Sequence, residues 1–395
     1  MGNIFDFDKI SYYNNYIINI DKKDYEKMQS CIAQLKKKYD SKIKMLCQIE
    51  KNNTIEFNFD NQKDFILKHK QLLIDIIKDV LKIYSEELKD LNVVFLSGSF
   101  ARGTNKMSSD VDLHFFYNNP NYNYIYEEIV SYIISRIINK SRDCIDPTFI
   151  FNVEDKNKVM VTSKMDKSEL KVILKYRKKE VKYTYKSGKK RRFYLQYINS
   201  RNLNKLFDYL NCEVNNDNYE WCHCFEIIKG KSVFNEMYNN LYLNELKKIN
   251  VDYINIKINR LKNTINNNKI NIIINSISQY KKNYQSKVFE LIYEYVSIVR
   301  FILMKENYNV KFLNLFDIYD INDSKDIINR YIFMKIYEYM WSLEKLTVYC
   351  HENKINYGLH NSDIINYSTK ELDESFSKLK DLILNDLERL EKLYE

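Results

Sequence analysis

The amino-acid sequence predicts an α+β protein in which a β-sheet with flanking helices is followed by an all-helical C-terminal domain. Residues 93–117, VVFLSGSFARGTNKMSSDVDLHFFY, contain two β-branched and aromatic runs on either side of a polar, glycine-containing loop. This is the pattern of strand, turn and strand. Beyond Gly230 the apolar residues recur every three to four positions, with almost no glycine and no proline, which is typical of helices.

Residues 1–62 are expected to form a small N-terminal α/β extension. Helical spacing from Asp21 to Tyr39 is followed by the runs Ile43–Ile49 and Thr54–Phe59, which predict a hairpin. Residues 63–235 are expected to form the domain that holds the sheet, and Phe65–Leu88 has the spacing of a long amphipathic helix packed against it. Residues 236–395 are expected to form the helical domain.

The remaining elements follow in chain order. Pro120 ends the second motif strand, and Tyr124–Ile138 is expected to be an amphipathic helix. Further strand-like runs are Thr148–Val153, Lys158–Ser163, Glu169–Tyr176, Val181–Lys186 and Phe193–Ile198. The predicted C-terminal helices are Leu241–Asn266, Ile270–Ser278, Val288–Lys305, Asp326–His351 and Lys370–Tyr394.

Composition limits the class of protein. A 45% hydrophobic fraction with 34 tyrosines and 21 phenylalanines excludes a disordered chain. The net charge of +9 suits an anionic substrate such as a nucleotide without requiring nucleic acid. Seven scattered cysteines with no CxxC pair, and the lack of a secretory signal or a long apolar run, lead us to expect a cytoplasmic protein with no membrane contact.

Two aspartates at the start of the second motif strand indicate the chemistry. Alternate residues of a strand share a face, so Asp110 and Asp112 are expected to project together. Two converging carboxylates repel unless a divalent cation lies between them, and Mg²⁺ suits carboxylates combined with substrate phosphates. Gly98 permits a sharp turn beside a bound group, and the Ser99 hydroxyl and nearby amides can hold phosphate oxygens. The alternative is that Asp110 is a turn residue.

These residues resemble the signature of a known superfamily. Gly98-Ser99, Arg102-Gly103-Thr104 and Ser109-Asp110-Val111-Asp112-Leu113 are similar to the motif of polymerase-beta-type nucleotidyltransferases, most closely the antibiotic adenylyltransferase and minimal nucleotidyltransferase branches. The resemblance implies a mixed β-sheet and metal-dependent transfer of a nucleoside monophosphate, with AMP from ATP expected, and release of pyrophosphate. Mg²⁺, or alternatively Mn²⁺, would bind Asp110 and Asp112. The implied nucleotide-binding residues are Gly98, Ser99, Arg102, Gly103, Thr104 and Ser109.

Such a site usually has a third carboxylate from a later strand, which helps bind metal and accepts a proton. The candidates are Asp146, Glu154 and Glu169. We favour Glu169 as the third catalytic residue, because it begins an alternating strand and is similar to the third acidic residue of antibiotic adenylyltransferases. Each candidate has the alternative interpretation of an exposed acid or a turn residue.

Three other patterns have two interpretations each. Trp221-Cys222-His223-Cys224 is more typical of buried thiols than of a zinc site, because its spacing is too close. Phe225–Gly230 is similar to the point where nucleotidyltransferase catalytic domains meet a helical one, or is a helix ending at a glycine cap. The basic segments Arg177–Lys179 and Lys186–Arg192 form either a solvated hairpin or a site for a polyanion.

The acceptor of the transferred group is open. One hypothesis is a hydroxyl-bearing small molecule, bound where the C-terminal helices close over the site. The residues of that surface expected from the resemblance, Tyr293, Tyr295 and Arg300, have core packing as their simpler interpretation. A second hypothesis is a nucleotide second-messenger or oligonucleotide synthase, or an enzyme that modifies a protein or tRNA. A third is a catalytically inactive nucleotide-binding module.

Overall fold

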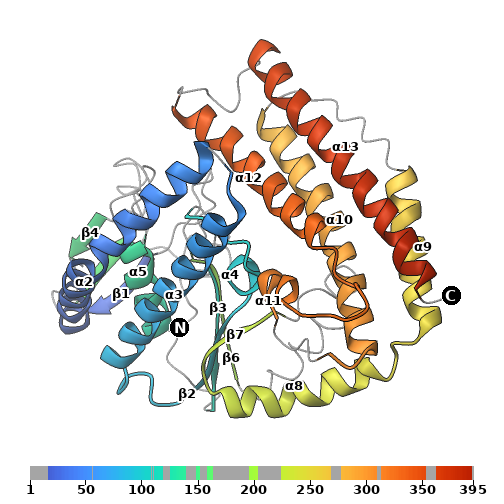
Figure 1. The fold of residues 1–395 in the computed structure, drawn as a ribbon. Coiled ribbons are helices and arrows are strands. Elements are labelled where there is room, and N and C mark those ends of the chain that lie inside the picture. Colours follow the sequence, from blue (N-terminus) through green and yellow to red (C-terminus); the bar gives the residue numbers. More distant parts are fainter. Residues whose placement is uncertain are drawn as a thin grey trace, which may run out of the picture.

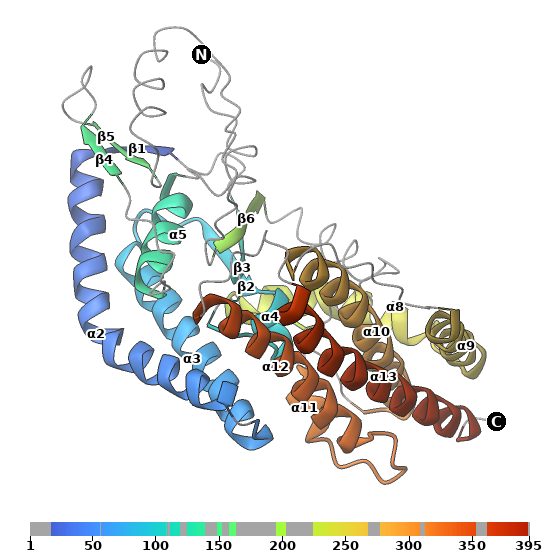
Figure 2. The same ribbon diagram turned by 90° about the horizontal axis from the view of Figure 1, so that it is seen from above.

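The computed structural model describes residues 17–55, 57–107, 109, 111–118, 125–138, 148–151, 158–162, 195–202, 224–267, 277–308, 313–352 and 362–393. Within these ranges the chain is α+β, as predicted. Its main sheet lies between helices of the N-terminal half and helices of the C-terminal half (Figures 1 and 2). None of the described helices combines the length and the apolar character needed to cross a bilayer.

The main sheet is mixed and has four described strands in the order β6-β3-β2-β7. These strands are β2 (Leu91–Leu96), β3 (Val111–Tyr117), β6 (Leu195–Asn202) and β7 (Glu226–Lys229). The predicted strand pair is confirmed: β2 and β3 are antiparallel, with Leu96 opposite Leu113. β6 pairs with β3 in parallel, and β7 pairs with β2 antiparallel. The two motif strands are therefore the central strands of this sheet.

Both faces of the central strands are buried, which explains their nearly continuous apolar sequence. Phe95 is fully buried and stacks on His114 at 4.7 Å between ring centroids and on Phe116 at 5.8 Å. Phe225 and Phe234 contact the same ring edge-on. Two central strands buried in this way form a rigid base for the loop between them.

The N-terminal half contains α2 (Lys22–Ile55), α3 (Phe59–Ile83) and α5 (Ile125–Ile138). The hairpin predicted for 43–59 is wrong, because α2 continues through Ile43 and Leu46, which are buried with Tyr39 on one helical face. That face packs against α3, so tertiary contact outweighs the β-branched residues of the segment. The helices predicted at Phe65–Leu88 and Tyr124–Ile138 are confirmed as α3 and α5.

A second sheet, with the described order β1-β5-β4, lies beside α2 (Figure 2). Its strands are β1 (Ile17–Asp21), β4 (Thr148–Phe151) and β5 (Lys158–Thr162), all antiparallel to their neighbours. β4 and β5 coincide with predicted strand-like runs, whereas β1 was not predicted. The runs Glu169–Tyr176 and Val181–Lys186 lie outside the described residues.

The C-terminal part is helical in all its described ranges, as predicted. Its helices are α8 (Lys231–Leu246), α9 (Val251–Asn267), α10 (Ile277–Lys305), α11 (Leu315–Tyr319), α12 (Arg330–Glu352) and α13 (Ser362–Lys392). The single helix predicted from Leu241 to Asn266 is two helices, because Asn250 caps α9 through the amide of Tyr253 at 2.8 Å. α11 was not predicted. Residues 226–229 form β7, so the alternative interpretation of this segment as a helix ending at Gly230 is wrong.

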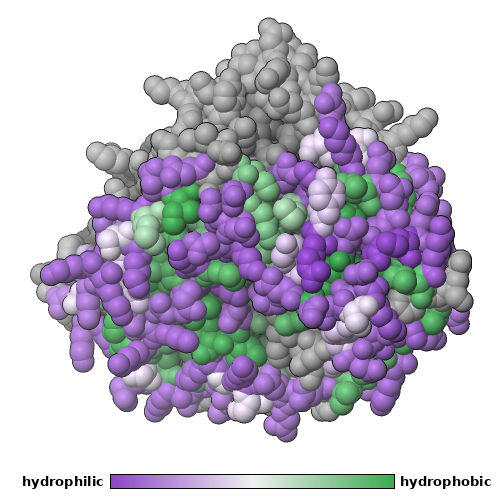
Figure 3. Space-filling model, viewed as in Figure 1, coloured by the Kyte–Doolittle hydropathy of each residue, from purple (hydrophilic) through white to green (hydrophobic). Residues whose placement is uncertain are grey.

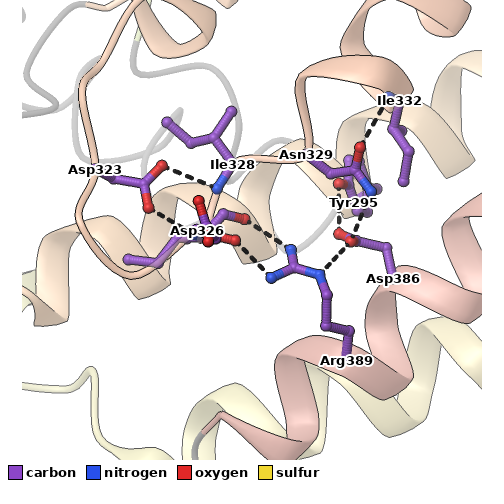
Figure 4. A network of polar contacts seen from close by, with 9 residues as sticks. Tyr295, Asp323, Asp326, Ile328, Asn329, Ile332, Asp386 and Arg389 are labelled. Atoms are coloured by element: carbon purple, nitrogen blue, oxygen red, sulfur yellow. Dashed lines mark hydrogen bonds and ion pairs between the residues drawn. The ribbon is translucent and has the colours of Figure 1, made fainter.

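A polar network connects α10, α13 and the segment before α12 (Figure 4). The Asp386 carboxylate accepts hydrogen bonds from the Tyr295 hydroxyl at 2.8 Å, the Asn329 amide at 3.0 Å and Arg389 Nε at 2.8 Å. Asp323 accepts from the amides of Ile327 and Ile328. The network fixes where α12 begins. The face of the molecule seen in Figure 3 is mostly hydrophilic, with apolar patches between the polar residues.

Candidate functional site

The Asp112 carboxylate lies directly against the backbone of Gly98. Gly98 begins the short helix α4 (Gly98–Arg102), which follows β2, and Asp112 is the second residue of β3. A β-carbon on Gly98 would lie 1.8 Å from Asp112 Oδ2, and Gly98 has a φ of 64°, in the left-handed region. Position 98 therefore requires glycine for two reasons, backbone conformation and space for the carboxylate.

The charge of Asp112 is held in a largely desolvated place. Burial raises the pKa of the Asp112 carboxyl above its ordinary value, and the positive charge of Arg102 acts in the opposite direction. An aspartate at this point of an otherwise apolar strand is costly without a compensating positive charge. Arg102 supplies part of that charge.

Arg102 and Gly103 contact the C-terminal helices. The Arg102 guanidinium carbon lies 5.2 Å from the ring centroid of Tyr293 in α10. The Gly103 carbonyl accepts a hydrogen bond of 2.8 Å from the hydroxyl of Tyr337 in α12. Gly103 has a φ of 77°, and its α-carbon faces Asn314 and Phe316 at the start of α11. The motif loop is therefore located where the sheet meets the helical region.

The other predicted nucleotide-binding residues have backbone roles in this loop. The Ser99 carbonyl accepts from the amides of Gly103 and, at 2.9 Å, Thr104, which closes α4. Thr104 is buried. The Ser109 hydroxyl accepts from the Lys106 amide at 2.8 Å, and the Ser109 amide donates to the Lys106 carbonyl. These contacts shape the turn that leads from α4 back to β3.

A histidine that the sequence analysis did not select lies beside the site. His114 is two residues after Asp112, on the same face of β3, and its Nε2 lies 2.9 Å from the Ser97 hydroxyl. Ser97 also donates its amide to the Asp112 carbonyl at 3.0 Å. The i, i+2 spacing is the sequence signal for this neighbour. Tyr337 and Asn314 had no such signal, because they are far from the motif in sequence.

Several predicted site residues lie outside the described residues: Asp110, Asp146, Glu154 and Glu169. β6, the described strand beside Asp112, contains no aspartate or glutamate; Tyr197 is the partner of Asp112 in that register. Within the described ranges, no three side chains of His, Cys, Asp or Glu form a group suited to a metal ion. The pairing of Asp110 with Asp112 and the choice of third carboxylate stay predictions.

The structure describes only part of the cysteine-containing and basic segments singled out in the sequence. Cys224 is buried and donates to the Leu313 carbonyl at 3.0 Å, whereas residues 221–223 and the basic segments 177–179 and 186–192 are outside the described ranges. Arg300 is buried and donates to Cys224 Sγ and the Leu313 carbonyl. Tyr293 and Tyr295 are buried as well, so the interpretation of core packing is confirmed. Tyr293 differs from the other two in that it also contacts the motif.

Comparison with known proteins agrees with this geometry. The family model described as "nucleotidyltransferase domain" matches residues 77–195, a range that includes the end of α3, both motif strands and α4. No curated protein matches the chain. The matched range includes the Gly98 and Asp112 pair described above. Residues 77–195 therefore match a nucleotidyltransferase domain, which is consistent with the polymerase-beta-type superfamily.

Proposed function

We propose that the protein transfers a nucleoside monophosphate, AMP, from a nucleoside triphosphate to a hydroxyl of a small-molecule acceptor and releases pyrophosphate. The observation that carries the proposal is the Asp112 carboxylate, held against Gly98 in a range that matches a nucleotidyltransferase domain and influenced by the positive charge of Arg102. We also propose three domains: an N-terminal extension of residues 1–62, a catalytic domain of residues 63–235, and a helical domain of residues 236–395 that closes the acceptor cleft. We further propose that the protein is cytoplasmic.

The residues present fit a divalent cation. Mg²⁺ prefers oxygen ligands, and the Asp112 carboxylate is a largely desolvated oxygen ligand. The absence of a side chain at Gly98 leaves room for this carboxylate, because a β-carbon there would collide with its Oδ2 atom. We assign Asp110 and Asp112 as the metal ligands, with Glu169 as the proposed third acid. When bound, Mg²⁺ (or Mn²⁺) offsets negative charge on the phosphates. Its attraction to Asp112 would also lower the pKa of that carboxyl.

The protein's own groups supply positioning and charge. The amides at the start of a helix have no intrahelical acceptor, so the turn at Gly98 and Ser99 offers N–H donors to triphosphate oxygens. α4 has only five residues, so individual hydrogen bonds matter here more than a helix dipole. Arg102, at the end of α4, adds a permanent positive charge that acts on Asp112. Oriented donors of this kind stabilise charge that develops in the transition state.

The test is pyrophosphate release from each labelled nucleoside triphosphate with Mg²⁺, with and without a panel of hydroxyl-bearing acceptors. Asp112→Asn should lower turnover by at least about 100-fold, since such electrostatic groups are typically worth this much. Its fold should be intact, because asparagine has nearly the same size and shape as aspartate and keeps the contact with Gly98. Asp64→Asn, which changes an exposed carboxylate paired with Lys68, is the matched control and should keep normal turnover.

Each result has a distinct meaning. Near-normal turnover of a folded Asp112→Asn protein would refute the mechanism. Product formed from nucleotide alone would favour the second-messenger or oligonucleotide alternative over a small-molecule acceptor. Nucleotide binding without turnover under all conditions would indicate an inactive binding module.

A further inference from the structure

Three separate elements of the helical region meet at two consecutive motif residues. α10 places the Tyr293 ring 5.2 Å from the Arg102 guanidinium carbon. α12 donates the Tyr337 hydroxyl to the Gly103 carbonyl, and α11 places Asn314 and Phe316 against the Gly103 α-carbon. Phe316 and Tyr337 stack on one another at 4.3 Å, so the contacts to Gly103 form one unit. The backbone at Arg102 and Gly103 is thus fixed by the helices.

A fixed backbone does not by itself fix an arginine side chain. Arginine has several rotatable bonds, and ordering them costs about 2 kcal/mol of conformational free energy. A desolvated aromatic ring offsets that cost, because the guanidinium is attracted to the face of the ring. Tyr293 is only 9% exposed, so packing in the core fixes the position of its ring independently of Arg102.

The direction in which Arg102 is held matters for the site. Arg102 ends the short helix α4 that begins at Gly98, next to the Asp112 carboxylate, and its positive charge acts on that carboxylate. Without the ring, more rotamers would be available to the arginine, including some directed away from Asp112. Tyr293 is distant from the motif in the sequence, and core packing alone does not require its contact with Arg102.

We propose that Tyr293 is a positioning residue for nucleotidyl transfer, whose ring holds the Arg102 guanidinium beside Asp112 to receive the nucleotide phosphates. This inference rests on the proposed function. It assigns to the C-terminal helices a part in nucleotide binding, exerted through Arg102, in addition to closing the acceptor cleft.

The first experiment needs no substrate. The Nε–H signal of Arg102 in the full-length protein, assigned by its loss in Arg102→Lys, reports the mobility of this side chain by NMR relaxation. Tyr293→Leu should increase that mobility, and Tyr293→Phe, which keeps the ring, should restore the wild-type value. Tyr295→Phe removes a buried hydrogen bond two residues away on the same helix, and should destabilise the protein without affecting Arg102.

The second experiment measures steady-state kinetics of the same variants with ATP and Mg²⁺. Tyr293→Leu should lower kcat/KM for ATP by about 2- to 30-fold, the range expected for loss of a cation–π contact. The change should appear in the KM for ATP, with the KM for the acceptor unaltered, and Tyr293→Phe should reverse it. A purely structural role would reduce the amount of active enzyme and leave the KM for ATP unchanged.

The outcomes separate this inference from the proposed function. Unchanged Arg102 mobility in folded Tyr293→Leu, or a wild-type KM for ATP, would overturn the inference even if the enzyme transfers nucleotides. A wild-type protein without transferase activity would refute the proposed function, and the NMR comparison alone would then decide whether Tyr293 holds Arg102. If Tyr293→Leu does not fold, Tyr293→Met, which keeps a long side chain, takes its place under the same criteria.

Discussion

Gly98 shows how one residue joins backbone geometry to chemistry. Gly98→Ala should destabilise the protein by about 1–2 kcal/mol, because a side chain in the left-handed region is strained. It should also reduce turnover to the level of Asp112→Asn, because the new β-carbon would occupy the place of the Asp112 carboxylate. Chemical denaturation and steady-state kinetics measure the two effects.

Gly230→Ala is the control for this substitution. Gly230 also has a left-handed φ, 74°, but its β-carbon would meet the Asn92 carbonyl oxygen at 2.3 Å, away from Asp112. This variant should lose stability and keep normal turnover per folded molecule. Equal loss of turnover in the two variants would show that Gly98 acts through stability alone.

His69 makes the fold sensitive to acid. Burial lowers the pKa of this fully buried imidazole to about 3, from an ordinary value of 6.5. The unfolded chain therefore binds a proton that the folded protein does not, over the range between these values. The contribution of His69 to stability is fully present above about pH 6.5. It should be lost as pH falls towards 3, at up to about 1.4 kcal/mol per pH unit.

The measurement is the free energy of unfolding between pH 7 and pH 4. His69→Gln keeps a polar group beside Asn105, whose amide nitrogen lies 3.1 Å from His69 Nδ1, and removes the titration. The variant should show a shallower dependence on pH than the wild type over this range. If the free energy of unfolding depended on pH equally in the two proteins, His69 would not be the source of the acid sensitivity.

At the scale of elements, α11 depends on a capping box. The Asn314 side chain accepts from the amides of Phe316 and Asp317 at 2.8 and 3.1 Å, and Asp317 accepts from the Asn314 amide at 2.9 Å. Asn314→Ala should cost about 0.5–2 kcal/mol, because the first amides of α11 lose their acceptor. Asn314→Asp retains a capping oxygen and should recover most of this loss in denaturant unfolding. If Asn314→Asp is as unstable as Asn314→Ala, loss of the capping hydrogen bonds is not the cause of the destabilisation.

Elements that were wrongly predicted share a physical cause. Residues 43–55 contain β-branched residues that favour a strand, yet they extend α2, because Ile43 and Leu46 complete a face buried against α3. Residues 226–229 have helix-compatible sequence, yet they pair with β2. In both cases burial against a distant partner outweighs local propensity.

At the scale of the whole molecule, the Asp386 network holds the helical region together (Figure 4). Asp386→Ala should destabilise the protein by about 1–3 kcal/mol, because it leaves the buried Tyr295 hydroxyl without its acceptor. Asp386→Asn keeps one acceptor oxygen and should cost less. Thermal and denaturant unfolding measure both, and a loss below about 1 kcal/mol in the alanine variant would refute the role of the network.

The network also bears on the site. It fixes the start of α12, and α12 delivers Tyr337 to Gly103, while α10 carries both Tyr295 of the network and Tyr293 beside Arg102. Glu50 of α2, in the predicted N-terminal extension, accepts from the Met107 amide at 2.8 Å. The motif loop is therefore held from both halves of the chain.

The sequence by itself determined the class of fold, the two motif strands and the presence of Gly98 and Asp112 at the turn between them. These features are local, since they follow from alternation in a strand, from the conformational freedom of glycine and from residues close in the chain. Only the tertiary structure decided that α2 is continuous, that β7 is a strand and that Tyr293 and Tyr337 contact the motif. Those features depend on which segments, far apart in the sequence, pack against one another in the folded chain. In a chain with 34 tyrosines, no local pattern distinguishes Tyr293 and Tyr337 from the others.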